Sequence, residues 1–188
     1  MTRAGCGRRV LGCALAALAN VCIAQAPAGP GNESVDLGVA PSAELRLREH
    51  SAPTPREVPG AKTIRTDALR DSLQAQPQPL LFDVLGGDAH ASLPGAIWLP
   101  GAGRGQSFTD TLQARFAQTL NALTKGDRKR PLVFFCQGPQ CWLSYNAALR
   151  AVVLGYEAVY WYRGGVEAWL AAGGELAPMK LTWRSPPE

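Results

Sequence analysis

The feature that most constrains the fold is an alternation of short apolar runs with longer stretches of helical pattern. Apolar runs of strand length lie at 80–85, 97–99, 132–135 and 158–162. Stretches typical of helices lie at 66–73, 108–123, 142–155 and 166–172. Strands that alternate with helices across short turns predict an α/β domain with a parallel sheet and helices on both of its faces.

Residues 1–26 have the pattern of a secretory signal peptide, which predicts export to the periplasm. Three arginines precede an apolar run over 10–19, and small residues follow it. The run is shorter than the ~20 residues that a membrane-spanning helix needs, so we expect cleavage rather than a retained anchor. Cleavage after Ala26 and cleavage after Ala28 both fit the pattern.

The rest of the chain divides into three further segments. Residues 27–60 are rich in Pro, Gly, Ala and Ser, and we expect a linker and a partly ordered N-terminal arm. Residues 61–180 form the predicted domain, and 181–188 form a C-terminal tail.

Charge gives little reason to expect a polyanionic partner. The sequence has 19 Lys and Arg against 15 Asp and Glu. Because three of the basic residues lie in the leader, 16 remain against 15 after cleavage (19 − 3 = 16). A net charge near +1 predicts neither nucleic acid nor a membrane surface as partner of the mature protein.

Removal of the leader leaves two of the five cysteines, Cys136 and Cys141. Cys136 follows the apolar run 132–135 and precedes a helix, which is where open α/β sheets bind their ligands. Loop N–H groups and the helix N-terminus favour a thiolate there by lowering the thiol pKa. A thiolate attacks sulfane sulfur and becomes a persulfide. We predict an anion-binding loop made by Gln137, Gly138, Gln140 and Trp142, with Arg163 as a candidate substrate-binding residue.

Four separated motifs resemble the successive signatures of a rhodanese-like domain. They are LFDV at Leu81–Val84, LPGAI at Leu93–Ile97, LVFFC at Leu132–Cys136 and YWYRGGVEAW at Tyr160–Trp169. The resemblance covers about 63–178 and implies a three-layer α/β sandwich. It also implies that Cys136 is the persulfide-forming nucleophile and that Asp83 supports the site.

Three longer segments are similar to periplasmic rhodanese-like proteins associated with pyrroloquinoline quinone-dependent alcohol catabolism, which carry a paired-cysteine-plus-tryptophan motif. The segments are HSAPTPREVPGAKTI at 50–64, GAIWLPGAGRG at 95–105 and CWLSYNAALRAVVLGYEAVYWY at 141–162. This resemblance implies a periplasmic dehydrogenase or cytochrome as a partner.

The chain also departs from the common rhodanese pattern. Leu85 replaces the usual arginine after the Asp-Val pair, and Cys141 replaces the arginine that often ends the loop. Pro139 has no N–H to offer an anion. The sulfur donor therefore stays open. A cysteine-dependent phosphatase is excluded, because Trp142 stands where that chemistry needs an arginine.

Three functions remain open at this stage. In the first, Cys136 transfers sulfur between a small donor and a thiol. In the second, Cys136 and Cys141 cycle between dithiol and disulfide, and in the third the domain docks a partner. Cys141 is accordingly a resolving thiol, half of a static bridge or a bystander, and Asp83 serves the chemistry or only the turn after its strand. His50 and His90 are isolated, so we expect no metal and no cofactor.

Overall fold

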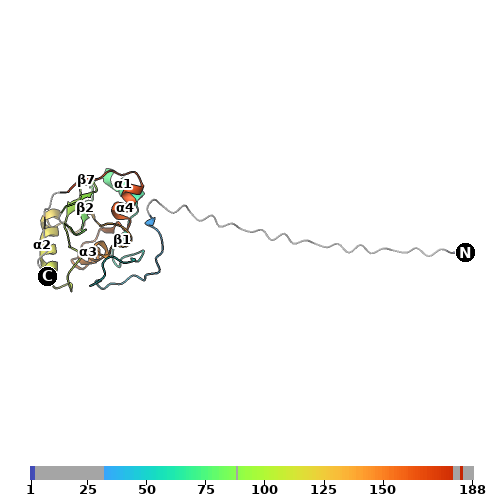
Figure 1. Ribbon diagram of the computed structural model, residues 1–188, viewed down its shortest axis with the longest axis horizontal. Coiled ribbons are helices and arrows are strands. Elements are labelled where there is room, and N and C mark those ends of the chain that lie inside the picture. Colours follow the sequence, from blue (N-terminus) through green and yellow to red (C-terminus); the bar gives the residue numbers. More distant parts are fainter. Residues whose placement is uncertain (3–31, 88, 180–182, 184–188) are drawn as a thin grey trace.

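The computed structural model describes residues 1–2, 32–87, 89–179 and 183 (Figure 1). The predicted leader, apart from its first two residues, and the predicted tail, apart from Trp183, lie outside the described residues. No helix within the described ranges is both long enough and apolar enough to cross a membrane.

A five-stranded parallel sheet lies at the centre, with the strand order β1-β6-β5-β2-β4. Its strands are β1 (Lys62–Thr63), β2 (Leu80–Asp83), β4 (Ile97–Trp98), β5 (Leu132–Phe135) and β6 (Val159–Trp161). A small antiparallel pair, β3 (Ala91–Ser92) and β7 (Ala177–Pro178), lies beside it. The parallel sheet was expected, whereas β1, β3 and β7 are too short to carry a strand pattern in the sequence.

Helices cover both faces of the sheet, which confirms the predicted three-layer α/β sandwich. They are α1 (Thr66–Gln74), α2 (Thr111–Thr124), α3 (Trp142–Val153) and α4 (Gly165–Ala171). Buried residues of α2 and α3 share one hydrophobic cluster with Phe82 and Phe134 of the sheet. Those of α1 and α4 share a second cluster with Leu81 and Phe135. Figure 1 shows the two helix pairs on opposite sides of the strands.

Helix α2 begins at Thr111, three residues later than the apolar spacing predicts. The cause is Asp110, whose carboxylate accepts a hydrogen bond from the Gln113 N–H at 2.7 Å and so caps the helix. The helix ends as expected at Lys125, which takes a left-handed conformation before Gly126.

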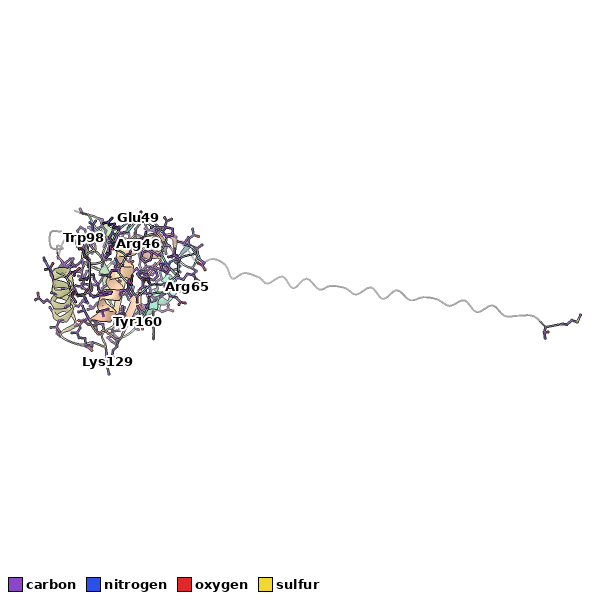
Figure 2. The ribbon with its side chains drawn as sticks, turned by 90° about the horizontal axis from the view of Figure 1, so that it is seen from below. Arg46, Glu49, Arg65, Trp98, Lys129 and Tyr160 are labelled. Atoms are coloured by element: carbon purple, nitrogen blue, oxygen red, sulfur yellow. A yellow bond between two sulfur atoms is a disulfide. The ribbon has the colours of Figure 1, made fainter. Side chains whose placement is uncertain are left out.

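Residues 33–58, here called the N-terminal arm, pack against the domain. The Glu33 carboxylate accepts hydrogen bonds from the N–H and hydroxyl of Thr66, at 3.0 and 2.8 Å, at the start of α1. Arg46 hydrogen-bonds Asn146 of α3 through its backbone N–H, at 3.0 Å, and its side chain forms an ion pair with Glu49 (Figure 2). Residues 33–58 of the Pro-rich segment therefore lie against the domain.

Candidate active site

Cys136 directly follows the central strand β5 and lies on the same face as α3. Strand pairing sets Phe82 beside Phe134 and Asp83 beside Phe135. Because side chains alternate between faces along a strand, Phe134 and Cys136 point to the α2 and α3 side, and both belong to the cluster there. The Cys136 side chain is buried, with 1% of the residue exposed.

The loop after Cys136 is fixed against the start of α4. The carbonyl oxygens of Cys136 and Gln137 accept hydrogen bonds from the N–H groups of Val166 and Glu167, both at 3.0 Å. Gly165 has a positive φ of 56°, and a Cβ there would collide with the Cys136 carbonyl oxygen. The double glycine in the sequence thus allows α4 to hold the cysteine loop in place.

Cys136 and Cys141 form a disulfide, so the structure brings together the two cysteines that the sequence singled out. Their Cα atoms are 6.4 Å apart, within the span that a disulfide bridges. Cys141 is the residue before α3, and 8% of it is exposed. The structure therefore describes the oxidised form of the site.

Two residues that the sequence reasoning missed complete the surroundings of the sulfur. The Ser144 hydroxyl oxygen lies 3.1 Å from Sγ of Cys136. The Trp161 indole N–H donates a hydrogen bond to that oxygen at 2.9 Å. Both are buried, with Ser144 on the first turn of α3 and Trp161 at the end of β6. The signal available in the sequence for Ser144 was its place three residues after Cys141. Helix and strand patterns do not reveal which buried polar side chains contact each other, so Trp161 had no such signal.

The N-terminal arm lies over the cysteine loop. The N–H and hydroxyl of Thr54 donate to the Pro139 carbonyl oxygen, at 3.1 and 2.6 Å. Trp142 donates its backbone N–H to the His50 carbonyl oxygen at 2.9 Å and its indole N–H to that of Pro53 at 3.0 Å. The arm therefore covers the loop on this side.

These contacts bear on the predicted anion-binding loop. The two donors of Trp142 are bonded to the arm, and the Gly138 carbonyl oxygen accepts from the Cys141 N–H at 3.0 Å. Gln137 and Gln140 are exposed, and the Gln137 side-chain amide donates to Glu167 at 3.4 Å. Anion binding by this loop stays a prediction.

Arg163, the candidate substrate-binding residue, holds the arm in this structure. Its guanidinium donates to the carbonyl oxygens of Glu33 and Val35, at 3.0 and 2.7 Å, and to the hydroxyl and carbonyl oxygens of Thr54, both at 3.1 Å. The side chain is buried, and burial lowers the pKa of Arg163. The substrate-binding role stays a prediction, and the observed role is to fasten two ends of the arm.

Asp83 ends β2 beside the site, but its carboxylate serves the turn that follows. It accepts hydrogen bonds from the Leu85 N–H at 2.9 Å, from the His90 ring at 2.8 Å and from the Ser92 hydroxyl. Its pairing with Phe135 directs it to the α1 and α4 side, away from the face that carries Cys136. The geometry favours the structural role among the two that the sequence left open.

No group of three His, Cys, Asp or Glu side chains gathers as metal ligands would within the ranges that the structure describes. The groups that the structure gathers at the site are two sulfur atoms, a hydroxyl, an indole N–H and the start of α3.

Comparisons with known proteins identify the family of the domain. The family model described as a rhodanese-like domain matches residues 65–172, more than half of the chain. A comparison with curated proteins found no match.

Solved structures share the fold at low sequence identity. A thiosulfate sulfurtransferase from Pseudomonas aeruginosa is 18% identical, with a TM-score of 0.50 and coverage of 68% of this chain. This chain covers only 22% of the Pseudomonas enzyme's length. The rhodanese-like domain of a protein from Anabaena is 20% identical, with a TM-score of 0.47 and coverage of 61% of this chain and 77% of the other. Because the family model matches more than half of its length, the chain belongs to the rhodanese-like domain family.

Proposed function

We propose that this protein is an exported sulfurtransferase in which Cys136 forms a persulfide. The observation that carries the proposal is the place of Cys136, between the central strand and the start of α3, with a second cysteine bonded to it. Family membership and the activity named for the Pseudomonas structure support it.

In the first step, the reduced Cys136 thiolate attacks the outer sulfur of a sulfane donor such as thiosulfate. A bond forms between the Cys136 sulfur and that outer sulfur, while the sulfur–sulfur bond of thiosulfate breaks. Sulfite leaves with the electron pair of the broken bond. The product is a Cys136 persulfide anion.

In the second step, Cys141 resolves the persulfide. The Cys141 thiol gives its proton to the outer sulfur of the persulfide anion, and the resulting Cys141 thiolate attacks Sγ of Cys136. The bond between the two persulfide sulfurs breaks, and the outer sulfur leaves as hydrosulfide with the electron pair. The transferred sulfur is reduced and the two cysteines are oxidised, so the step needs no other oxidant. The product is the disulfide that the structure contains, and a small or protein dithiol returns the site to its reduced form.

Peptide-resolved mass spectrometry tests the proposal. The reduced Cys141→Ser variant should gain one sulfur atom at Cys136 after treatment with thiosulfate or an organic persulfide, because its persulfide has no resolving thiol. Cys136→Ser is the matched control and should gain none. Peptide mapping separates Cys136 from the leader cysteines Cys6, Cys13 and Cys22. Absence of the adduct from Cys141→Ser with every sulfane donor would contradict persulfide formation.

The disulfide itself favours a second candidate function, a dithiol and disulfide redox protein that serves a quinone-dependent dehydrogenase or cytochrome in the periplasm. Such a cycle moves two electrons and needs both cysteines, whereas sulfur uptake needs Cys136 alone. Loss of Cys141 should then abolish electron exchange with the partner. If cells with Cys141→Ser grow like wild type on alcohols oxidised by that system, this candidate fails.

Export is supported by the leader pattern in 1–26 and by the disulfide, since disulfides persist mainly in oxidising compartments. N-terminal sequencing of the protein from a periplasmic fraction should find a start after Ala26 or Ala28. Recovery of the chain only from the cytoplasm, with its leader intact, would contradict this part of the proposal.

A further inference from the structure

A buried hydrogen-bond chain leads from Trp161 through Ser144 to the sulfur of Cys136. The indole nitrogen lies 2.9 Å from the serine oxygen, and that oxygen lies 3.1 Å from the sulfur. The same oxygen lies 3.4 Å from the Cys141 carbonyl oxygen. Ser144 and Trp161 are 1% and 0% exposed, so the protein itself sets these contacts.

The direction of each hydrogen bond follows from the donors available. An indole N–H only donates, so Trp161 occupies a lone pair of the serine oxygen. The single proton of Ser144 then points either to the Cys141 carbonyl oxygen or to the Cys136 sulfur. In the disulfide the sulfur is a weak neutral acceptor. When the disulfide is reduced and Cys136 ionises, the sulfur becomes a charged acceptor, and hydrogen bonds to charged groups are the stronger ones.

Because Cys136 is buried, the hydrogen bond from Ser144 affects the pKa of its thiol. Desolvation favours a neutral thiol and raises its pKa, whereas a hydrogen bond to the charged form lowers it. Cys136 is buried in the oxidised form, so a thiolate formed at the same place after reduction would need such a donor.

Trp161 is held in place for its part. Its ring meets Tyr145 edge-on, with centroids 5.4 Å apart and planes at 89°, and Tyr145 in turn bonds to Ser42 of the arm at 2.7 Å. The indole N–H is therefore fixed while the serine proton changes its acceptor.

We infer that Ser144 is a catalytic residue that donates its hydroxyl proton in a hydrogen bond to the Cys136 thiolate, and that Trp161 is the positioning residue for this hydroxyl. The inference rests on the proposed function in taking Cys136 as the nucleophile. It adds the group that keeps the nucleophile ionised.

The test measures the rate of Cys136 alkylation by iodoacetamide as a function of pH, by peptide-resolved mass spectrometry of the full chain in a reduced Cys141→Ser background. Adding Ser144→Ala should raise the apparent pKa of Cys136 by about one unit, which slows alkylation about tenfold at pH values well below that pKa. Adding Trp161→Phe, which keeps a ring and removes the N–H, should shift the profile in the same direction by less.

Ser72→Ala is the matched control, because it removes a serine hydroxyl from α1 on the opposite face, where the hydroxyl donates to the Leu69 carbonyl oxygen of its own helix. Its profile should coincide with that of the parent. Coincidence of the Ser144→Ala profile with the parent would overturn the inference. Alkylation involves no sulfur donor, so a shifted profile without any sulfur adduct would reject the proposed function alone, and an adduct with an unshifted profile would reject only the role of Ser144.

Discussion

On the α3 face of the sheet, the sulfur of Cys136 lies among a second cysteine, a hydroxyl and a cover supplied by the arm. On the opposite face, the Asp83 carboxylate is one strand away and accepts hydrogen bonds from Leu85, His90 and Ser92 of the segment that follows. Both residues come at the carboxyl ends of neighbouring strands. The pleat separates them, so position at a sheet edge does not by itself make two residues share a site.

The largest difference between the faces should appear in sulfur uptake. In the Cys141→Ser background, Asp83→Asn should still gain one sulfur at Cys136, because the carboxylate faces away from the thiol. The Cys136→Ser chain should gain none. Intact and peptide masses after thiosulfate treatment measure both. Complete loss of uptake in a folded Asp83→Asn chain would place Asp83 in the chemistry and break the comparison.

We expect the N-terminal arm, held by Arg163, to limit access of reductants to the disulfide on the α3 face. Arg163→Met leaves arm carbonyl groups without their charged donor and should lower the free energy of unfolding by about 3 kcal/mol, because buried acceptors that lose a donor keep their desolvation cost. The Cys136–Cys141 disulfide should also be reduced several-fold faster by dithiothreitol, because the arm is loosened.

Lys129→Met is a suitable control for Arg163→Met, since it removes a positive charge from an exposed side chain. Figure 2 shows Lys129 at the bottom of the domain, whereas the arm residue Arg46 lies near the top. Urea unfolding and the rate of disulfide reduction should both match those of the wild type. Equal reduction rates in Arg163→Met and the wild type would mean that the arm does not limit access.

On the Asp83 face, the expected effect is on stability alone. Asp83→Asn replaces a charged acceptor that is fully buried and should cost about 2 kcal/mol in urea unfolding. The pH profile of Cys136 alkylation should stay that of the parent. A shifted profile would show that Asp83 acts on the thiol through the sheet edge.

The smallest effect should be a loss of unfolding free energy at acid pH that arises on the α3 face. Although burial raises the pKa of Asp110, hydrogen bonds from Arg150 and from backbone N–H groups lower it to about 2. A lowered folded-state pKa means that this stabilisation is complete above the unfolded pKa of ~3.9 and is lost as pH falls towards 2.

Between pH 5 and pH 2, the free energy of unfolding of the wild type should therefore fall by about 1 kcal/mol more than that of Asp110→Asn. Asp71→Asn, at an exposed position of α1 on the other face, should follow the wild type. If the free energy of unfolding depended on pH in the same way in the wild type and Asp110→Asn, Asp110 would not stabilise the α3 face through its charge.

Much of the sheet and its helices could be predicted from the sequence. The run 132–135 is β5, and the α2 pattern failed only at its start, where the Asp110 cap replaced the first turn. The arm was predicted only in part, because proline-rich sequence gives no sign that Arg163 and Pro139 bind it across the fold. Cys136 and Cys141 were found from their place in the sequence, whereas Ser144 and Trp161 depend on which side chains the pleat and the helix turn towards the sulfur.

The central claim is that Cys136 takes up a sulfur atom and Cys141 releases it. Its most direct test counts the hydrosulfide released and the disulfide formed when the reduced wild-type chain receives a single addition of sulfane donor. The account predicts about one hydrosulfide per disulfide formed, following the balance of the resolving step, with no hydrosulfide and a retained adduct in Cys141→Ser. Formation of the disulfide without hydrosulfide, or release of hydrosulfide at the same rate by Cys136→Ser, would contradict it.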